Sequence, residues 1–188
     1  MMRRTFLVGA LLLFFAGCSS LQVSSDYNPD YDFSKLHKAA ILYAKSSDNT
    51  ISLAQQRFAK AIKEELSRKG FVITDKKEAD FYVIFHLNIT EKTQVVTDYR
   101  TIGLYPYYPA YYGYAMAVPV QREYSWTEGR FIIDAVDPRG NKIFWRGTAT
   151  DRLHDFKTPR ERMDYIQKVV AEVLKDFPPK TSETKGKK

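Results

Sequence analysis

The chain has 188 residues, of which 44% are hydrophobic and 27% are charged, and its formal net charge is +7 at pH 7. This length suits a single domain with its own hydrophobic core. Much of the positive charge lies at the two ends: Arg3 and Arg4 near the start, and four Lys against one Glu in residues 180–188. Because the body between the ends is close to neutral, the charge does not predict a nucleic-acid-binding surface, and we expect no nucleic-acid partner.

Residues 1–17 have the pattern of a bacterial export signal. The two Arg are followed by an uncharged apolar run over residues 6–16. This run is shorter than the roughly 20 residues that an α-helix needs to span a bilayer. A positive start followed by a short apolar run is typical of a secretory signal peptide instead.

The apolar run ends in Phe15-Ala16-Gly17-Cys18, which holds the only cysteine of the chain and resembles the lipobox of bacterial lipoproteins. The resemblance implies that the Cys18 thiol receives a diacylglycerol, that the signal peptide is cut between Gly17 and Cys18, and that a further acyl chain such as palmitate is added to the new amine. One acyl chain anchors a protein only weakly, whereas two or three hold it firmly in a membrane. Since Ser19 follows Cys18, the resemblance also favours the outer membrane, with the domain in the periplasm. We expect residues 18–25 to form a polar tether.

Two helices are predicted by their caps and by the spacing of their apolar residues. In the segment 52–70, Ser52 and Gln55 form a capping-box pattern, and Gly70 suits the position after the helix. The segment 158–177 begins with Thr158 as cap and Glu161 three residues later, and it ends before two prolines. Each segment carries an apolar stripe of the kind that packs on a core.

Alternating apolar residues predict several strands. Residues 38–44 and 71–74 flank the first helix, residues 80–89 alternate apolar and polar side chains, and residues 123–137 and 142–150 flank a turn with Pro and Gly, which predicts a β-hairpin. Trp126 and Phe131 are an odd number of positions apart, so in a regular strand they would lie on opposite faces of the sheet. A β-bulge near Gly129 would bring both onto the same face. Both helices need an apolar partner, so we expect an α+β fold: a two-layer sandwich of a mainly antiparallel sheet with two helices packed on one face, formed by a single domain over residues 26–179.

Several short motifs, in this order, resemble a bacterial lipoprotein family built on the domain of unknown function DUF4136. They are Phe33, Lys69-Gly70, Asp80-Phe81, Trp145-Arg146-Gly147 and Phe177-Pro178-Pro179. The resemblance covers nearly the whole chain after the leader. It implies an envelope lipoprotein with an α+β domain, and it implies no reaction.

The sequence holds no catalytic motif and no cofactor-binding motif. It contains no Walker loop, no G-x-G-x-x-G, no G-x-S-x-G and no H-E-x-x-H. His86 falls among apolar strand residues, where we expect it to be partly buried, and His154 precedes the second helix, where we expect a loop hydrogen bond. Residues 26–32 carry side-chain oxygens at alternate positions, as a calcium-binding loop does at its start. The Gly and the Glu that such a loop needs further along are absent. The residues of this weak calcium-site hypothesis are Asp26, Asn28, Asp30 and Asp32.

Residues 101–121 contain no charge and are rich in Tyr, Pro and Gly, which predicts a long loop. Tyrosine offers apolar area together with a hydroxyl group and is common at interfaces. The loop either recognises a protein, glycan or lipid partner or folds over the edge of the core. The candidate contact residues are Tyr105, Tyr107, Tyr108, Tyr111, Tyr112 and Tyr114.

The favoured function is therefore a non-catalytic, lipid-anchored lipoprotein that binds a partner or serves envelope assembly, with the membrane as one partner through acylated Cys18. The alternatives are an enzyme that acts on envelope glycans or lipids and a weak calcium-binding protein. An enzyme would require a concave pocket that holds His86 or His154 beside a carboxylate with a shifted pKa. The basic tail, residues 180–188, lacks large apolar residues and is predicted to be disordered.

Overall fold

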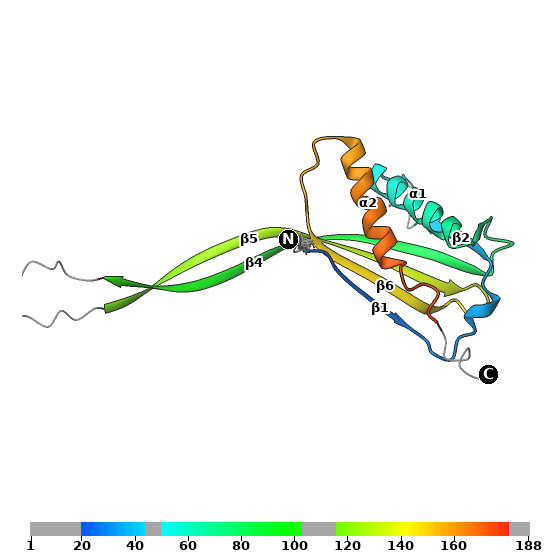
Figure 1. Cartoon of the computed structure of the whole chain (residues 1–188), viewed down its shortest axis with the longest axis horizontal. Helices are drawn as coiled ribbons and strands as arrows, with labels where there is room; N and C mark the ends of the chain where they lie inside the picture. The colour runs from blue at the N-terminus through cyan, green and yellow to red at the C-terminus, as the bar shows by residue number, and fades with distance from the viewer. Residues whose placement is uncertain (1–19, 44–49, 103–115, 181–188) are drawn as a thin grey trace, which may run out of the picture.

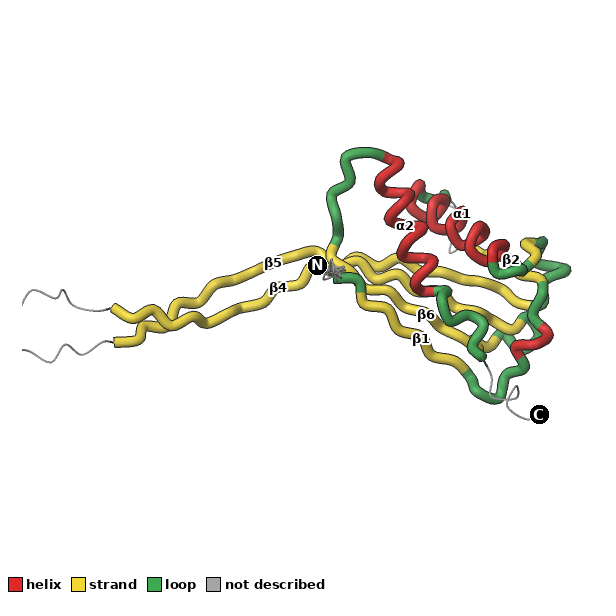
Figure 2. The backbone as a smooth tube through the Cα atoms, in the orientation of Figure 1, coloured by secondary structure: helices red, strands yellow, loops and turns green. Residues whose placement is uncertain are grey.

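The computed structural model describes residues 20–43, 50–102 and 116–180. The predicted signal peptide, Cys18, all six candidate tyrosines and the tail beyond Lys180 lie outside the described residues. The described chain forms one mixed sheet with two helices on one of its faces (Figures 1 and 2). The predicted two-layer α+β sandwich is confirmed.

The sheet has six strands in the order β1-β6-β5-β4-β2-β3. All neighbouring pairs are antiparallel except β2, which runs parallel to both β3 and β4. The strands are β1 (Gln22–Tyr27), β2 (Lys38–Tyr43), β3 (Val72–Ile73), β4 (Phe81–Ile102), β5 (Met116–Asp137) and β6 (Lys142–Arg152). The predicted hairpin joins β5 to β6, and the amide of Asn141 donates to the carbonyl of Asp137 at 2.9 Å.

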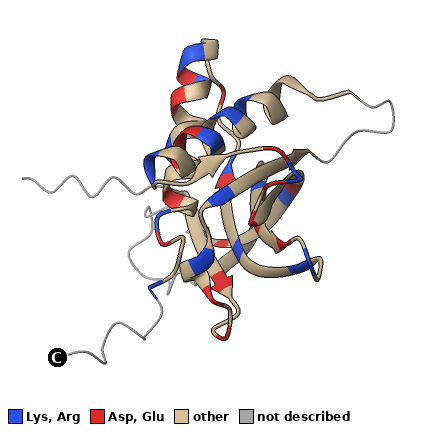
Figure 3. Ribbon diagram, turned by 90° about the vertical axis from the view of Figure 1, so that its right-hand side faces the viewer, with Lys and Arg blue, Asp and Glu red and all other residues tan. Residues whose placement is uncertain are grey.

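The two helices are α1 (Leu53–Arg68) and α2 (Pro159–Val173), and a short 3-10 turn (Phe33–Lys35) lies between β1 and β2. The capping box of Ser52 and Gln55 is present, and Gly70 has the left-handed φ of +92° that ends α1 in a Schellman turn. At α2 the cap is Thr158, as predicted, but the Glu161 carboxylate accepts from the Lys157 amide rather than from Thr158. Acidic and basic residues are interspersed over the helices and strands (Figure 3).

The core is richest in aromatic rings at the end of the sheet where β4 begins. Phe177, just after α2, lies 4.8 Å from Trp145 and 5.7 Å from Phe81, measured between ring centroids. Phe71, just after α1, lies 5.5 Å from Phe81. The C-terminal ends of both helices are therefore held on the sheet through the same cluster of rings.

At its opposite end the sheet narrows to a long two-stranded ribbon, the arm (Figures 1 and 2). Strand β6 pairs with β5 only as far as Glu128, and β2 pairs with β4 only as far as Phe85. Beyond these points β4 and β5 pair with each other alone, from Glu91↔Thr127 to Ile102↔Met116. We call residues 91–102 and 116–127 the arm. At 3.4 Å per residue it is roughly 40 Å long.

Three sequence-based predictions were wrong in detail. The loop expected over 101–121 begins and ends in strand, because β4 continues to Ile102 and β5 starts at Met116. The tether expected over 18–25 includes most of β1, which pairs with β6 from Gln22 onward. The register of β5 is continuous through Gly129, and its irregularity lies between Ala135 and Val136 instead.

Gly147 provides a test of the packing between α2 and the sheet. A methyl group at this position would lie 2.5 Å from Val173 Cγ1 and closer still to the Trp145 ring. Overpacking of this kind costs about 1–3 kcal/mol. We therefore expect Gly147→Ala to lower the free energy of unfolding by about that amount in urea titrations. Gly140→Ala is the control, because its methyl group would meet nothing nearer than Lys142 Cγ at 3.7 Å. Equal stabilities of the two variants would contradict the described packing.

Candidate functional site

A pocket of about 380 Å³ lies between the helices and the sheet, at the end of the body where the arm leaves. Pockets for small ligands typically measure about 300–1,000 Å³. Its interior is apolar and is formed by residues of both helices and of the three central strands. These residues are Phe58, Leu87, Phe131, Ala149, Ile166 and Val169. Leu21, just before β1, also lines the pocket.

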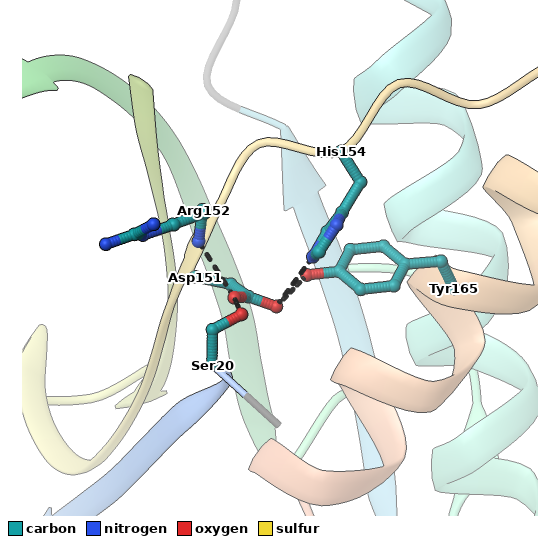
Figure 4. Close-up of polar contacts among 5 residues, drawn as sticks. All are labelled: Ser20, Asp151, Arg152, His154 and Tyr165. Carbon is teal, nitrogen blue, oxygen red and sulfur yellow. Dashed lines mark hydrogen bonds and ion pairs between the residues drawn. The ribbon is translucent and has the colours of Figure 1, made fainter. Parts of the chain in front are cut away.

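One wall of the pocket is built around the buried carboxylate of Asp151, on β6 (Figure 4). The Tyr165 hydroxyl of α2 donates to Asp151 Oδ2 at 2.5 Å, and His154 Nε2 lies 3.3 Å from the same oxygen. The Ser20 hydroxyl and the Arg152 amide both donate to Oδ1. This carboxylate thus joins the N-terminal segment, the sheet and α2.

The hydrogen bonds determine the charge state of this cluster. Burial acts to raise the pKa of Asp151, but the hydrogen bonds from Ser20, Tyr165, His154 and Arg152 together outweigh burial and lower it from 3.8. For Tyr165, burial and the bond to Asp151 both raise the pKa above its ordinary value of 10.0. At neutral pH the cluster therefore holds an ionised carboxylate and a protonated phenol.

The enzyme hypothesis required a pocket with a histidine beside a carboxylate, and His154 and Asp151 meet this condition. The hydrogen bonds differ from those of a nucleophilic triad, in which the serine donates to the histidine. Here Ser20, His154 and Tyr165 all converge on one carboxylate (Figure 4). This geometry is better suited to holding a wall of the pocket in place than to relaying a proton.

The other sequence candidates lie apart from this pocket. His86 pairs with Ile132 on β5 and is exposed, so the expected partial burial was wrong. The oxygens proposed for calcium have local partners: Asp26 accepts from the Tyr27 amide, and Asn28 accepts from the Asp30 amide. Hydrogen bonds from Lys35 and Ser34 lower the pKa of Asp32 to about 2. Among the described residues, no group of three or more His, Cys, Asp or Glu is arranged to hold a metal ion.

Sequence reasoning missed Ser20 and Tyr165 as site residues. The expected loop hydrogen bond of His154 is present, and its partner is Asp151. The spacing of Asp151 and His154 was visible, but Ser20 is separated from Asp151 by 131 positions. Only the pairing of β1 with β6 brings it there.

Comparison with known proteins adds the family. The model of the family described as "Domain of unknown function (DUF4136)" matches residues 23–179. The chain belongs to this family. No curated protein matches its sequence significantly.

Solved structures resemble the fold at low sequence identity. A PDZ domain protein from Parabacteroides distasonis is 15% identical, with a TM-score of 0.52 over 86% of this chain. The match spans only 37% of that protein, and it supports the fold alone. The PelC dodecamer from Paraburkholderia phytofirmans is 12% identical, with a TM-score of 0.46 over 82% of this chain and 94% of that one. A minor lipoprotein from Acinetobacter baumannii is 12% identical, with a TM-score of 0.38 over 75% of this chain and 91% of that one. Both overlap too loosely to support an argument.

No helix within residues 20–43, 50–102 and 116–180 is long and apolar enough to cross a membrane.

The Asp151 cluster predicts a pH-dependent contribution to stability. Because folding lowers the pKa of Asp151, the carboxylate stabilises the fold above pH 3.8, and this contribution is lost as the pH falls through the lower pKa of the folded state. We expect Asp151→Asn to cost about 1–3 kcal/mol at pH 7, since it disturbs buried donors. We also expect it to flatten the fall in stability towards low pH, measured by urea unfolding across the acid range. Asp155→Asn, a change at a neighbouring exposed carboxylate, is the control. An unchanged acid profile in Asp151→Asn would contradict the assignment.

Proposed function

We propose that the protein is a lipoprotein of the bacterial envelope, anchored by an acylated Cys18 in the outer membrane and facing the periplasm, which binds a partner through its arm without catalysing a reaction. The observation that carries this proposal is the arm itself, which leaves the body beside the start of the described chain. The partner is an envelope protein or a glycan.

The position of Ser20 supports an anchor close to the root of the arm. Ser20 is held by Asp151. Just past the end of β6, the Leu153 amide donates to the carbonyl of Thr127, the arm residue of β5 next to the body, at 2.9 Å. Cys18 precedes Ser20 by two residues, which span at most roughly 7 Å. A lipid on Cys18 would therefore hold the root of the arm at the membrane surface.

The arm has the physical character of a binding element. A two-stranded ribbon without further support is only marginally stable in water. Each of its strands also presents an unpaired edge to which another chain can add. Large apolar side chains are exposed along it: Val95 (58%), Tyr99 (72%) and Tyr124 (50%). These features favour a partner that covers the ribbon.

The Tyr-rich segment joins the two strands of the arm in the sequence, so any contact made by Tyr105, Tyr107, Tyr108, Tyr111, Tyr112 or Tyr114 would extend the surface of the arm. Tyrosine is well suited to such contacts because it buries a large area at a small cost in side-chain entropy. We therefore propose these residues as part of the contact surface.

Cys18→Ser tests the anchor. We expect the native chain to sediment with membranes and to carry a mass increase of a diacylglycerol and an acyl chain at residue 18 after removal of residues 1–17. The variant should lose both properties, because stable anchoring needs more than one acyl chain. Membrane fractionation and intact-mass spectrometry measure this. Ser19→Ala is the control, and an unmodified thiol in the native chain would refute the anchor.

Photocrosslinking tests the arm. We expect p-benzoylphenylalanine at Tyr99, Tyr108 or Tyr124 to give a discrete adduct in intact cells, because Tyr99 and Tyr124 lie on the strands of the arm and Tyr108 lies in the sequence that joins them. The same residue at Tyr27, which is 41% exposed on β1, is the control. Replacing the six loop tyrosines by Ser should abolish the adduct formed from residue 99 or 124 while leaving the melting temperature nearly unchanged. A large loss of stability would instead assign these tyrosines to the fold and contradict the proposed role.

A further inference from the structure

Two arginines without ionic partners stand at the pocket between the helices and the sheet. Arg57 of α1 and Arg162 of α2 both line it. Neither forms an ion pair with any carboxylate among the described residues, whereas Arg68, on the same helix as Arg57, pairs with Glu65. Arg162 instead lies over the ring of Phe156, with 5.8 Å between its Cζ and the ring centroid. Each helix thus contributes one arginine to the pocket lining, and neither has an acidic partner among the described residues.

Two further arginines among the lining residues, Arg130 and Arg152, do not add to this charge. Arg130 precedes Phe131 and Arg152 follows Asp151, and the side chains of Phe131 and Asp151 face the helices. The two arginine side chains therefore extend to the opposite face of the sheet. Arg152 lies there over the ring of Trp126, 4.8 Å from its centroid, and Figure 4 shows it pointing away from the pocket. The positive potential on the helix side therefore comes from Arg57 and Arg162.

The helices strengthen this potential. Ala54, Arg57 and Phe58 belong to the first half of α1, and Arg162, Tyr165 and Ile166 belong to the first half of α2, so the N-terminal halves of both helices line the pocket. The N-terminus of a helix carries a partial positive charge. The opposing carboxylate, Asp151, already accepts hydrogen bonds from Ser20, Tyr165, His154 and Arg152. An added anion would meet a net positive mouth.

The rest of the pocket is suited to a hydrocarbon chain. Its interior is formed by aromatic and aliphatic side chains, and Ile89 and Leu153, which also line it, are 70% and 50% exposed. Exposed apolar residues around a pocket commonly mark a ligand site. If a methylene group needs about the volume of a water molecule, roughly 30 Å³, then 380 Å³ holds on the order of a dozen carbon atoms. This is room for one acyl chain and not for two.

We propose that this pocket binds a fatty acid of about twelve carbon atoms, with the acyl chain between the helices and the sheet and the carboxylate at Arg57 and Arg162. The charge complementarity selects an anionic head, and the volume selects a single chain. The inference rests on the pocket alone and holds whether or not Cys18 is acylated or the arm has a partner.

The test uses the full chain, purified from membranes and reconstituted in phosphatidylcholine vesicles, with a photoreactive diazirine analogue of laurate as the probe. We expect labelled peptides to contain Phe58, Leu87 or Ile166 and the labelling to be competed by laurate but not by dodecanol. The double variant Arg57→Gln/Arg162→Gln should reduce the labelling roughly tenfold, as expected for the loss of charge-assisted hydrogen bonds.

Matched variants separate the pocket from general effects. Lys60→Gln/Arg160→Gln removes the same charge from the same two helices outside the pocket lining and should label like the native chain. Ala54→Trp should block labelling by filling the pocket, whereas Ser67→Trp, at an exposed position elsewhere on α1, should not. Circular dichroism establishes that each variant is folded.

Several outcomes would overturn the proposal. Among these are equal labelling of both double variants, equal competition by dodecanol, labelling confined to the arm, and preferential labelling of the pocket by a photoreactive diacyl phosphatidylglycerol. The last result would assign the pocket to a membrane phospholipid instead. An absence of pocket labelling in the native chain would likewise reject a free fatty acid as its ligand.

Discussion

The pairing of β4 with β5 is the interaction on which the rest of the molecule depends. The register runs without a break from Tyr82↔Val136 to Ile102↔Met116, so the same two strands form the centre of the sheet and the whole of the arm. In the body these strands are flanked by β2 and β6, and the two helices cover one face of the sheet. Burial of Phe81, Val83 and Phe131 fixes which face each residue presents, and a slip of one position would reverse that face. The ordered body thereby sets the register of the unsupported arm.

The N-terminal segment would couple this arrangement to the anchor proposed at Cys18. Strand β1 pairs with β6 over its whole length, and Ser20 is bound to Asp151 at the end where the arm begins. The described fold therefore begins two residues after Cys18, the site of the proposed lipid. With that lipid in place, so short a separation would restrain the orientation of the domain as well as its distance from the membrane.

The accuracy of the sequence-based predictions follows from the range of the interactions involved. The capping box at Ser52 and the turn at Gly70 depend on neighbours a few positions away, so they could be read directly. The arm could not be predicted in this way, because the uncharged stretch 101–121, which contains Pro119, has the composition of a loop. Pro119 is tolerated in β5 since it pairs with Tyr99 in a ribbon whose outer edges are free. The hydrogen bond between Ser20 and Asp151 depends on the pairing of β1 with β6, so no local sequence pattern could predict it.

The residues that carry the family resemblance lie at the end of the body remote from the arm. Phe81, Trp145 and Phe177 form the aromatic cluster there, Asp80 accepts from the amides of His37 and Lys38, and Gly147 leaves room for Trp145 and Val173. Each of these roles concerns packing or the start of a strand. The pocket arginines and the arm occupy the other end and belong to none of the matching motifs. The motifs that carry the resemblance therefore account for the packing of the core, whereas the proposed ligand and partner depend on residues outside those motifs.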